Sequence, residues 1–511
     1  MSWQQIYQSR QLREHERGTV VKDWGGRLPV ALFFPNTYYL GMSSLAIHAL
    51  YQLWNARDDT LCERLFTDLT PIVSVESGSP ADYFPVVAMT LSYEMDYFHV
   101  ASFFRDTGIP PLAADRDETH PLIIAGGPAI SANPEPLAPM LDAALIGEVE
   151  PAFDSLTDAL LLARDGRDAA LAALRHVSGI YLPGRSISEE EPQPVVRQWL
   201  KDLDDYPTHS AMRTPDTEFG DMGLIEIARG CSRGCRFCLA GYAYRPPRQR
   251  SVESILAQAR ALMSEGDRLG LVSAAVSDHS DIDRLASGLC QMGARISVSS
   301  LRADSISESL VRALAQSGTQ TVTIAPEAGS ERLRQTINKR QSEDAILSAI
   351  ELARRHGLPH LKLYFMLGLP TEDESDVTAL VDLALACGLR FGRRVTVNIT
   401  PFVPKAHTPF QRLPQTPAKI VMRRIRYVER ELQRHGIAVK SESPAWAEIQ
   451  GTLARGDSRL AEALLMDERV TPATWRRALE GAGVSSDEIL RERSAEERLP
   501  WDFLQFPVQR G

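Results

Sequence analysis

Three cysteines stand close together in the run Arg229-Gly-Cys-Ser-Arg-Gly-Cys-Arg-Phe-Cys238. They are Cys231, Cys235 and Cys238, in the spacing Cys-x3-Cys-x2-Cys, and no fourth cysteine lies nearby. Three thiolates can hold three irons of a four-iron cluster and leave the fourth iron open to a substrate or cofactor. The spacing therefore indicates a reactive iron–sulfur centre more than a structural staple.

Other uses of these thiols fit the sequence less well. A structural zinc site takes four closed ligands, usually from two separated Cys-x2-Cys pairs, and here one such pair stands beside a single extra cysteine. A disulfide framework is also a poor fit, because six cysteines in 511 residues are sparse. Isolated cysteines more often pack as small apolar side chains, which is our interpretation of Cys62, Cys290 and Cys387.

The neighbours of the three cysteines favour a bound cluster. Gly230 and Gly234 allow the backbone to wrap closely around a bulky inorganic ligand. Three arginines in the same run put positive charge beside a thiolate-rich, anionic group: Arg229, Arg233 and Arg236.

The composition is that of an ordinary globular protein, with 44% apolar and 24% charged residues. A chain of 511 residues is long enough for two or three domains. Its net charge of -10 argues against broad nucleic-acid binding, although a local basic groove stays open. We find no signal peptide at the N-terminus and no run of the ~18 apolar residues that would span a bilayer, so we expect a cytoplasmic location.

The first part of the chain alternates strand-like and helix-like segments, which predicts a parallel, doubly wound α/β domain over residues 26–178, after an arm at 1–25. The expected strands are Leu28–Phe34, Val86–Ser92, Pro121–Ala125 and Ala143–Ile146, and the expected helices include Ser43–Asn55 and Tyr97–Phe104. Gly126 and Gly127 follow a strand directly, as in a turn that lets backbone approach a ligand or in an ordinary strand-to-helix turn. Residues 179–220, rich in turn residues that include Glu189–Pro192, are expected to form a linker.

A second alternating series over residues 221–440 predicts a partial (β/α)6 barrel, in which catalytic groups sit at the carboxyl ends of strands. The expected strands are Gly223–Ala228, Leu271–Val276, Ile296–Ser300, Thr321–Ala325, Leu361–Met366 and Val395–Ile399. Cys231 comes just after the first of them. Residues 441–511 are predicted to be a small helical extension, with helices at Leu460–Met466, Ala473–Gly481 and Ser486–Glu492.

These features resemble the radical S-adenosylmethionine (radical SAM) superfamily. The cysteine spacing matches, as does Phe237 before the last cysteine. Three later segments resemble strand motifs of its methylthiotransferase-like branch: Ala325–Glu331, Lys362–Pro370 and Asn398–Pro404. The likeness covers residues 221–410 and implies a 4Fe-4S cluster, SAM as cofactor, and an electron donor such as flavodoxin or ferredoxin.

The domain before the barrel resembles the cobalamin-binding fold that precedes many radical SAM enzymes, in loops at Gly126–Pro128 and Gly147–Glu150 and in the run Arg245–Arg250. Cobalamin domains that replace the lower ligand carry Asp-x-His-x-x-Gly after the first strand. The matching window here is Asn36-Thr-Tyr-Tyr-Leu-Gly41, with Tyr38 in the histidine position. A neutral phenol is a poor cobalt ligand, so either cobalamin binds without a protein ligand or the fold has lost the cofactor.

The resemblance also assigns residues to SAM. The open iron would chelate its amine and carboxylate, Glu327 would accept the ribose hydroxyls, Ser330 would contact the methionyl carboxylate, and Gly368 would lie near the adenine. Glu327 could instead pair with Arg302 or Lys362 inside the barrel. Ser273, Ser277 and Asp278 are alternatives for holding the methionyl amine, and no catalytic residue is assigned.

Three functional hypotheses remain at this stage. The first is a radical SAM enzyme that uses cobalamin to methylate an unactivated carbon. The second is a radical SAM enzyme whose first domain is a scaffold without cofactor and which performs another radical transformation. The third is a non-catalytic iron–sulfur redox or sensor protein, which four cysteines would suit better than three. The substrate is not indicated by the sequence.

Overall fold

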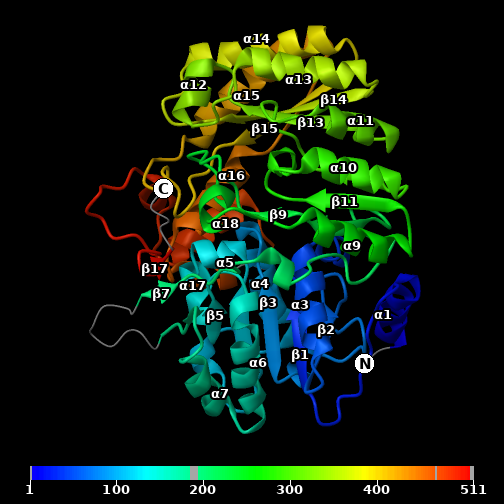
Figure 1. Cartoon of the computed structure of the whole chain (residues 1–511). Coiled ribbons are helices and arrows are strands. Elements are labelled where there is room, and N and C mark those ends of the chain that lie inside the picture. Colours follow the sequence, from blue (N-terminus) through cyan, green and yellow to red (C-terminus); the bar gives the residue numbers. More distant parts are fainter. Residues whose placement is uncertain (1–2, 185–193, 467–468, 507–511) are drawn as a thin grey trace.

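The computed structural model describes residues 3–184, 194–466 and 469–506, which form a mixed α/β structure with two sets of parallel strands (Figure 1). The expected turn-rich run Glu189–Pro192 lies outside the described residues. In Figure 1 the first set lies below and the second above, and the carboxyl ends of the lower strands point towards the upper part.

The lower sheet has the strand order β2-β1-β3-β4-β5-β6, parallel except for the last pair. Its strands are β1 (Leu28–Phe33), β2 (Thr60–Leu65), β3 (Val86–Thr90), β4 (Leu122–Gly126), β5 (Ala143–Leu145) and β6 (Ile180–Tyr181). The helices that belong to it are α2 (Tyr38–Gly41), α3 (Leu45–Ala56), α4 (Tyr97–Thr107), α5 (Pro128–Ala132), α6 (Phe153–Leu161) and α7 (Arg167–Leu174). The four strands expected here from the sequence are present within a residue or two.

Strand β2 was missed because its sequence, Thr-Leu-Cys-Glu-Arg-Leu, carries two charges in the middle. Both are buried all the same. Arg64 has no exposed side-chain surface and donates to Glu16 and Glu76, each at 2.7 Å. Glu16 follows helix α1 (Trp3–His15), so this buried network ties the N-terminal arm to the sheet.

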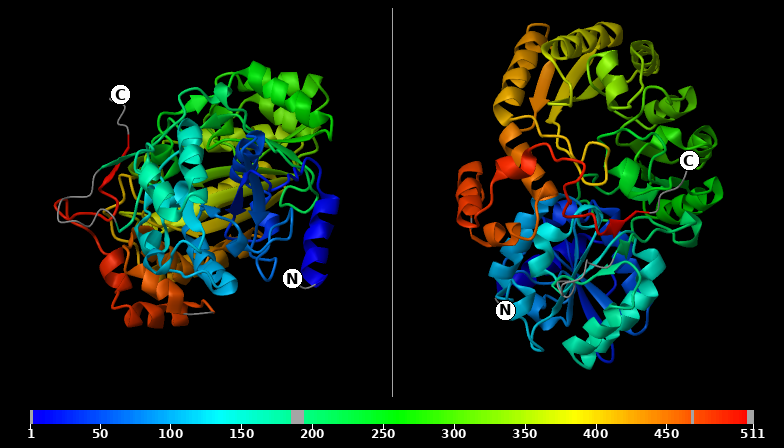
Figure 2. Two further views of the ribbon diagram at one scale, coloured as in Figure 1. Left: turned by 90° about the horizontal axis from the view of Figure 1, so that it is seen from below. Right: turned by 90° about the vertical axis from the view of Figure 1, so that its left-hand side faces the viewer.

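The upper set consists of two sheets, β12-β11-β8 and β13-β14-β15-β16, linked by an isolated parallel bridge between Leu301 and Ile324. Their strands are β8 (Gly223–Glu226), β11 (Arg268–Val272), β12 (Arg295–Val298), β13 (Thr321–Glu327), β14 (His360–Leu367), β15 (Arg394–Pro401) and β16 (Ala438–Ser441). The helices between them are α9 (Val252–Met263), α10 (Ile282–Gln291), α11 (Glu308–Gln316), α12 (Glu331–Thr336), α13 (Glu343–Arg355), α14 (Glu374–Phe391) and α15 (Ala418–Gln433). Figure 2 shows these helices on the outside of the curved row of strands.

Two details of the upper strands differ from expectation. The strand expected at Leu271–Val276 ends at Val272, so Ser273, Ser277 and Asp278 belong to the loop beyond its carboxyl end. Strand β16 was not expected, because its four residues are mostly exposed at the edge of the sheet and carry no apolar alternation.

The C-terminal extension contains α16 (Pro444–Arg455), α17 (Leu460–Met466), α18 (Pro472–Gly481) and α19 (Ser486–Leu490), and β17 (Leu504–Gln505) pairs with β7 (Val195–Val196). These helices share one apolar core with α4 and with one face of the lower sheet, while α3, α6 and α7 cover the other face. Trp475 and Trp501 are buried in that core. The extension is therefore a structural layer of the lower domain.

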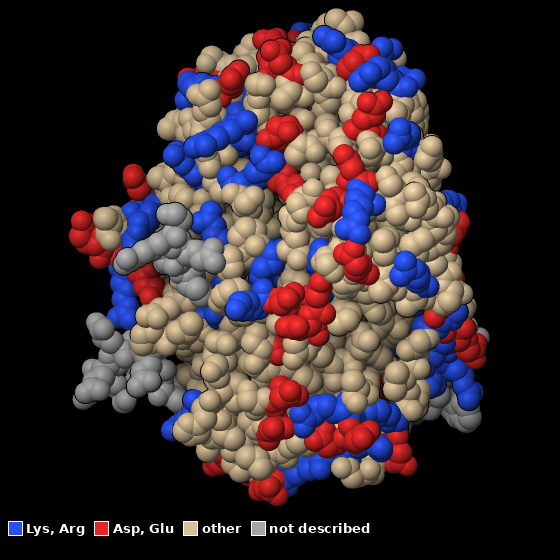
Figure 3. Space-filling model, in the orientation of Figure 1, with Lys and Arg blue, Asp and Glu red and all other residues tan. Residues whose placement is uncertain are grey.

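Acidic and basic side chains are interspersed over the face seen in Figure 3. Within the described residues, none of the helices combines the length and the apolar character needed to cross a bilayer.

The buried Arg64 network gives a test of the lower domain. Arg64→Met removes the cation and leaves the Glu16 and Glu76 carboxylates buried without their partner, which should lower the free energy of unfolding by about 3–5 kcal/mol. Urea denaturation followed by circular dichroism measures the change. The matched control is Arg57→Met, whose aspartate partners are largely exposed and whose loss should cost below about 1 kcal/mol. Equal effects of the two substitutions would contradict this assignment.

Candidate functional site

A cavity of about 340 Å³ lies between the lower sheet and the upper strands, and we call it the inter-sheet cavity. Its lower wall comes from the carboxyl ends of β1, β3, β4 and β5 together with helix α3, and its upper wall from the ends of β8 and β11 and from β9 (Ala228–Arg229). Most of its surface is apolar, with contributions from Leu32, Ala46, Ala49, Trp54, Ala88, Ile124, Leu145 and Val272. Carboxyl ends of parallel strands are where α/β folds bind ligands.

The three cysteines sit in the loop of residues 230–239, here called the cysteine loop, which leads from β9 into α8 (Ala240–Ala243). Gly230 and Ala240, at its two ends, both line the inter-sheet cavity. Gly230 has a φ of +81°, and a Cβ there would come within 2.4 Å of the Tyr244 carbonyl oxygen, so only glycine fits without displacement. The loop is further held by Asn338, whose Nδ2 donates to the Gly234 carbonyl at 2.8 Å.

The thiols of the cysteine loop lie in a shielded environment. Burial raises the pKa of the Cys235 and Cys238 thiols, and the neighbouring Cys231 adds to the effect in both. Lys339 and Arg302 act in the opposite direction on Cys235. The three thiols are therefore near enough to influence one another, and two cations lie near Cys235. Among the described residues, no group of three or more His, Cys, Asp or Glu side chains is arranged to hold a single metal ion.

Phe237 belongs to the cysteine loop, and Glu327 lies near it, since its charge acts on the thiols of Cys235 and Cys238. Phe237 packs against a small apolar cluster formed by Ala328, Leu333, Ile337, Leu369, Phe402 and Phe410. Glu327, at the end of β13, adopts a φ of +70° and accepts a hydrogen bond from Lys339 Nζ at 3.0 Å. The sequence suggested Arg302 or Lys362 as alternative ion-pair partners of Glu327. That prediction was wrong, because the partner is Lys339.

Two further residues assigned to SAM differ in how well they suit the role. Gly368, directly after β14, has a φ of +87°, and its N–H donates to Glu372 at 3.0 Å while Thr416 donates to its carbonyl. Ser330 is the N-cap of α12, where its oxygen accepts from the Leu333 N–H at 3.1 Å and its hydroxyl donates to Asp376. The hydroxyl proton of Ser330 is thus already used, which does not support its expected contact with a methionyl carboxylate.

Of the residues expected to face a second cofactor, the glycines line the inter-sheet cavity and the tyrosine does not. Gly126 and Gly127 both do so, and Gly127, at a φ of +104°, could not carry a Cβ because one would lie 2.5 Å from the Leu91 carbonyl oxygen. The expectation that Tyr38 faces this cofactor was wrong. Its hydroxyl donates to Glu16 at 2.6 Å and its ring packs edge-on against Phe66, away from the cavity.

The loop beyond β11 contains the three residues considered for holding a methionyl amine, and their contacts differ. Asp278 forms two hydrogen bonds of 2.7 Å with Arg233, and although burial opposes it, this arginine holds the pKa of Asp278 below its usual value. Ser277 shares a hydrogen bond with Ser305 at 2.9 Å. Ser273 is the one of the three candidates that lines the inter-sheet cavity.

The sequence indicated Arg229 only as a positive charge near the cysteines, yet this residue forms three ion pairs in the site. Arg229 donates to Glu148 at 2.7 Å, to Glu150 at 2.8 Å and to Glu226 at 2.9 Å, and all four residues line the inter-sheet cavity. Glu148 and Glu150 follow β5 of the lower sheet, whereas Glu226 ends β8 of the upper one. The Glu-Val-Glu run after a strand was a visible signal, but its partner could not be read from spacing.

Arg248 and Arg250, from the run Arg245–Arg250 noted in the sequence, are buried. Arg248 donates to Glu148 at 2.7 Å and Arg250 to Glu226 at 3.0 Å. The first of these pairs joins the upper part to the lower one, whereas the second lies within the upper part.

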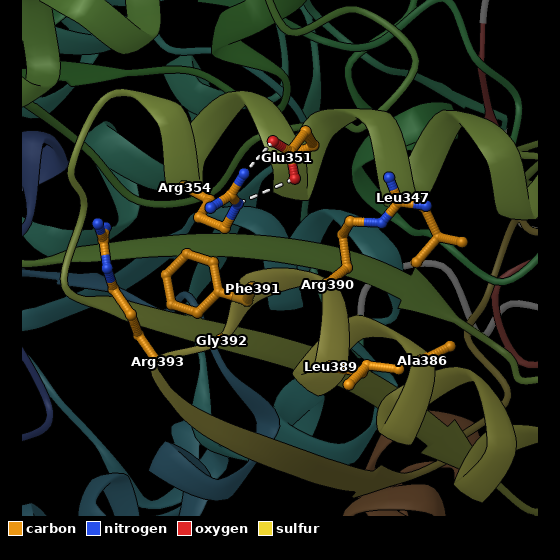
Figure 4. A pocket seen from close by; sticks show the side chains of 9 residues that line it. All are labelled: Leu347, Glu351, Arg354, Ala386, Leu389, Arg390, Phe391, Gly392 and Arg393. Atoms are coloured by element: carbon orange, nitrogen blue, oxygen red, sulfur yellow. Dashed lines mark hydrogen bonds and ion pairs between the residues drawn. The ribbon is translucent and has the colours of Figure 1, made fainter.

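A second cavity, of about 540 Å³, lies on the outer side of the upper domain where α13 and α14 end (Figure 4). Arg354, Arg390 and Arg393 reach into it, and Arg354 is paired with Glu351 at 2.6 Å. Because these residues adjoin the amino-terminal ends of β14 and β15, the cavity is at the opposite end of the strands from the cysteine loop.

Comparison with known proteins relates both parts of the chain to one family. The model for "Radical SAM proteins, N-terminal" matches residues 46–183, and that for the "Radical SAM superfamily" matches residues 225–384. An uncharacterized protein from Methanocaldococcus jannaschii is 33% identical over 443 residues, which is 85% of this chain and 90% of that protein.

Two solved structures share the fold at low sequence identity. The radical S-adenosylmethionine methyltransferase TsrM from Kitasatospora setae, with cobalamin and a [4Fe-4S] cluster bound, is 14% identical, with a TM-score of 0.51 over 89% of this chain and 99% of that one. The cobalamin-dependent S-adenosylmethionine radical enzyme OxsB, with aqua-cobalamin bound, is also 14% identical, with a TM-score of 0.54 over 86% and 66% of the two chains.

The conformation of Gly230 can be tested through the iron that the protein binds. Gly230→Ala forces a Cβ against the Tyr244 carbonyl oxygen at a left-handed φ and should reduce iron bound after anaerobic reconstitution by more than about half. Colorimetric iron and sulfide analysis measures it. Gly241→Ala, in the helix that follows, has open space around its Cβ and should keep wild-type iron content. Normal iron in the Gly230→Ala protein would refute the close approach.

Proposed function

The chain belongs to the radical SAM superfamily, and we propose that it is a cobalamin-dependent methyltransferase of that superfamily, with its cluster on Cys231, Cys235 and Cys238. One observation carries the proposal: the two ends of the cysteine loop line the same cavity as Gly126 and Gly127 of the lower sheet. A cofactor held by the lower sheet would thus adjoin the cluster directly. Under this proposal, residues 26–178 are a cobalamin-binding-type Rossmann-like domain and residues 221–440 a partial (β/α)6 barrel.

The residues in and around the cysteine loop suit an iron–sulfur cluster that binds SAM. When bound, the cluster supplies the electron that breaks the sulfonium–C5′ bond of SAM, and a low-potential donor such as flavodoxin or ferredoxin would replace it. Glu327 would accept hydrogen bonds from the ribose hydroxyls, held in position by Lys339. Phe237 would cover one side of the cluster with an apolar ring, and the left-handed turn at Gly368 would border the adenine. Water exclusion by these groups protects a reactive radical.

The inter-sheet cavity suits part of a corrin. Its wall is largely apolar and includes three glycines at two strand ends, Gly126 and Gly127 at the end of β4 and Gly147 after β5, whose backbone a flat ring could approach. Its volume of about 340 Å³ takes in only part of so large a cofactor, so the rest would have to lie outside it. Within the described chain its lining includes neither histidine nor cysteine. Cobalamin would therefore bind without a nitrogen ligand from the protein.

A second candidate function keeps the radical SAM chemistry and makes the lower domain a scaffold without cofactor. The small cavity volume and the absence of a histidine from its described lining favour this alternative. The fold shared with TsrM and OxsB, whose structures hold cobalamin, favours the first. We rank methyl transfer first because Gly230 of the cysteine loop lines the same cavity as the apolar wall.

The cluster assignment is tested by removing its ligands. The triple variant Cys231→Ala, Cys235→Ala, Cys238→Ala, purified and reconstituted without oxygen, should lose the broad iron–sulfur absorption band and form no 5′-deoxyadenosine from SAM and dithionite. Chromatography of the nucleoside products measures cleavage. Cys290→Ala, outside the site, should behave as wild type. An absorption band that persists in the triple variant would sink the assignment.

The cobalamin assignment has its own test. Wild-type protein incubated with hydroxocobalamin should retain it through gel filtration, and the paramagnetic resonance spectrum of the reduced Co(II) form should be the same in unlabelled and 15N-labelled protein, because no protein nitrogen would bind cobalt. Ala49→Phe fills the cavity wall from α3 and should cut retention by more than about tenfold, since overfilling a packed site is not tolerated. Gln52→Phe, exposed on the same helix, is the control. If wild type retains no cobalamin, the scaffold function is the right one.

A further inference from the structure

The sheet β13-β14-β15-β16 has one apolar face and one polar face. Along β14, Leu361, Leu363, Phe365 and Leu367 are at most 1% exposed and pack against the helices outside. The alternate residues face the inside of the curved row of strands and are partly accessible to solvent: His360, Lys362, Tyr364 and Met366. Successive side chains of a strand point to opposite faces, so the accessible set defines an open inner surface.

Two lysines lie on this inner surface. Tyr364 pairs in register with Asn398 of β15, and Asn398 with Lys440 of β16. Val439 packs into the outer apolar core, so Lys440, the next residue, points inward. On β14, Lys362 is two residues before Tyr364, and its Nζ stands 5.9 Å from that ring centroid. The four side chains therefore share one face.

This inner surface carries positive charges that are not matched by carboxylates among the described residues. Burial lowers the pKa of His360, and Arg394, Lys362 and Lys440 lower it further, which shows that these cations gather near the imidazole. In the described part of the chain, neither lysine forms an ion pair with a carboxylate. Arg302, in contrast, pairs with Asp304 at 3.0 Å. Asn398 Oδ1 is buried and accepts no hydrogen bond within the described residues.

We propose that Lys362 and Lys440, with Tyr364 and Asn398 between them, bind the anionic group, a carboxylate or a phosphate, of the substrate. This inference rests on the proposed function. Strands two apart in a sheet are separated by about 10 Å, a gap that two lysine side chains can close around an anion. Opposite charge attracts it, while Asn398 and the Tyr364 hydroxyl supply hydrogen bonds to its neighbours.

The position of the lysines fits a substrate that reaches towards the cysteine loop. Met366 lies four residues further along the same face of β14, roughly 13 Å from Lys362 at 3.3 Å per residue. Met366 packs against the same small apolar cluster as Phe237, the neighbour of Cys238. A molecule anchored by its anion at the lysines would extend along this face with its other end near the cysteine loop.

Binding of simple anions to the full chain tests the site. Anaerobically reconstituted protein is titrated by calorimetry at low salt with inorganic phosphate in one arm and succinate in the other. We expect binding of at least one probe, weakened about tenfold in Lys362→Gln and in Lys440→Gln, as for the loss of one charged hydrogen bond. The stronger of the two probes identifies a phosphate or a carboxylate as the group recognised. Lys419→Gln, which removes an exposed lysine from the outer helix α15, should bind as wild type.

Failure of this inference is distinguishable from failure of the proposed function. Wild-type protein that cleaves SAM but binds neither probe, or binds equally in all three variants, overturns the anion site alone. Protein that binds a probe through both lysines but cleaves no SAM keeps the site and overturns the function. Should Lys362→Gln not fold, as judged by its melting temperature and iron content, Lys362→Arg should retain binding because it keeps the charge, and Lys440→Gln on the exposed edge strand carries the test.

Discussion

The contact of Arg229 with three carboxylates is the interaction on which the rest of the site depends. Its guanidinium joins Glu148 and Glu150 of the lower domain to Glu226 of the upper one, and the next two residues are Gly230 and Cys231. Removing such charges from water is costly unless each is paired. Arg248 and Arg250 complete the pairing of Glu148 and Glu226, so the network favours one arrangement of the two sheets and fixes the start of the cysteine loop in it.

That arrangement sets two parallel sheets with their carboxyl ends towards one cavity. Parallel strands need long connections, and their carboxyl ends collect the turns that bind ligands. Here the lower sheet contributes glycine turns and an apolar wall, and the upper one contributes the cysteine loop. The C-terminal helices pack on the lower sheet although they follow the upper strands in sequence, which adds a second connection between the domains.

In the upper domain, paired and unpaired charges lie in different places. Near the cysteine loop, three cations are paired with carboxylates: Arg233 with Asp278, Arg302 with Asp304, and Lys339 with Glu327. Further down the inner face, the lysines of β14 and β16 have no such partner among the described residues. Paired charges give a rigid, neutral surround for radical chemistry, whereas unpaired cations are available to a ligand. Under our proposals, this difference would separate a cofactor end from a substrate end within one row of strands.

The sequence by itself determined the family, the cysteine loop and most strands, because these depend on local spacing: three thiols in eight residues, apolar runs with period two, and glycines after strands. It also led to the position of Cys231 at a strand end. It missed β2, where Glu63 and Arg64 interrupt the apolar run, and misjudged Tyr38, whose hydroxyl meets a glutamate 22 residues earlier. The partners of Arg229, Glu327 and Ser330 were likewise decided only by the tertiary structure. Ion pairs join residues far apart in the chain, and no local pattern records which side chains the fold brings together.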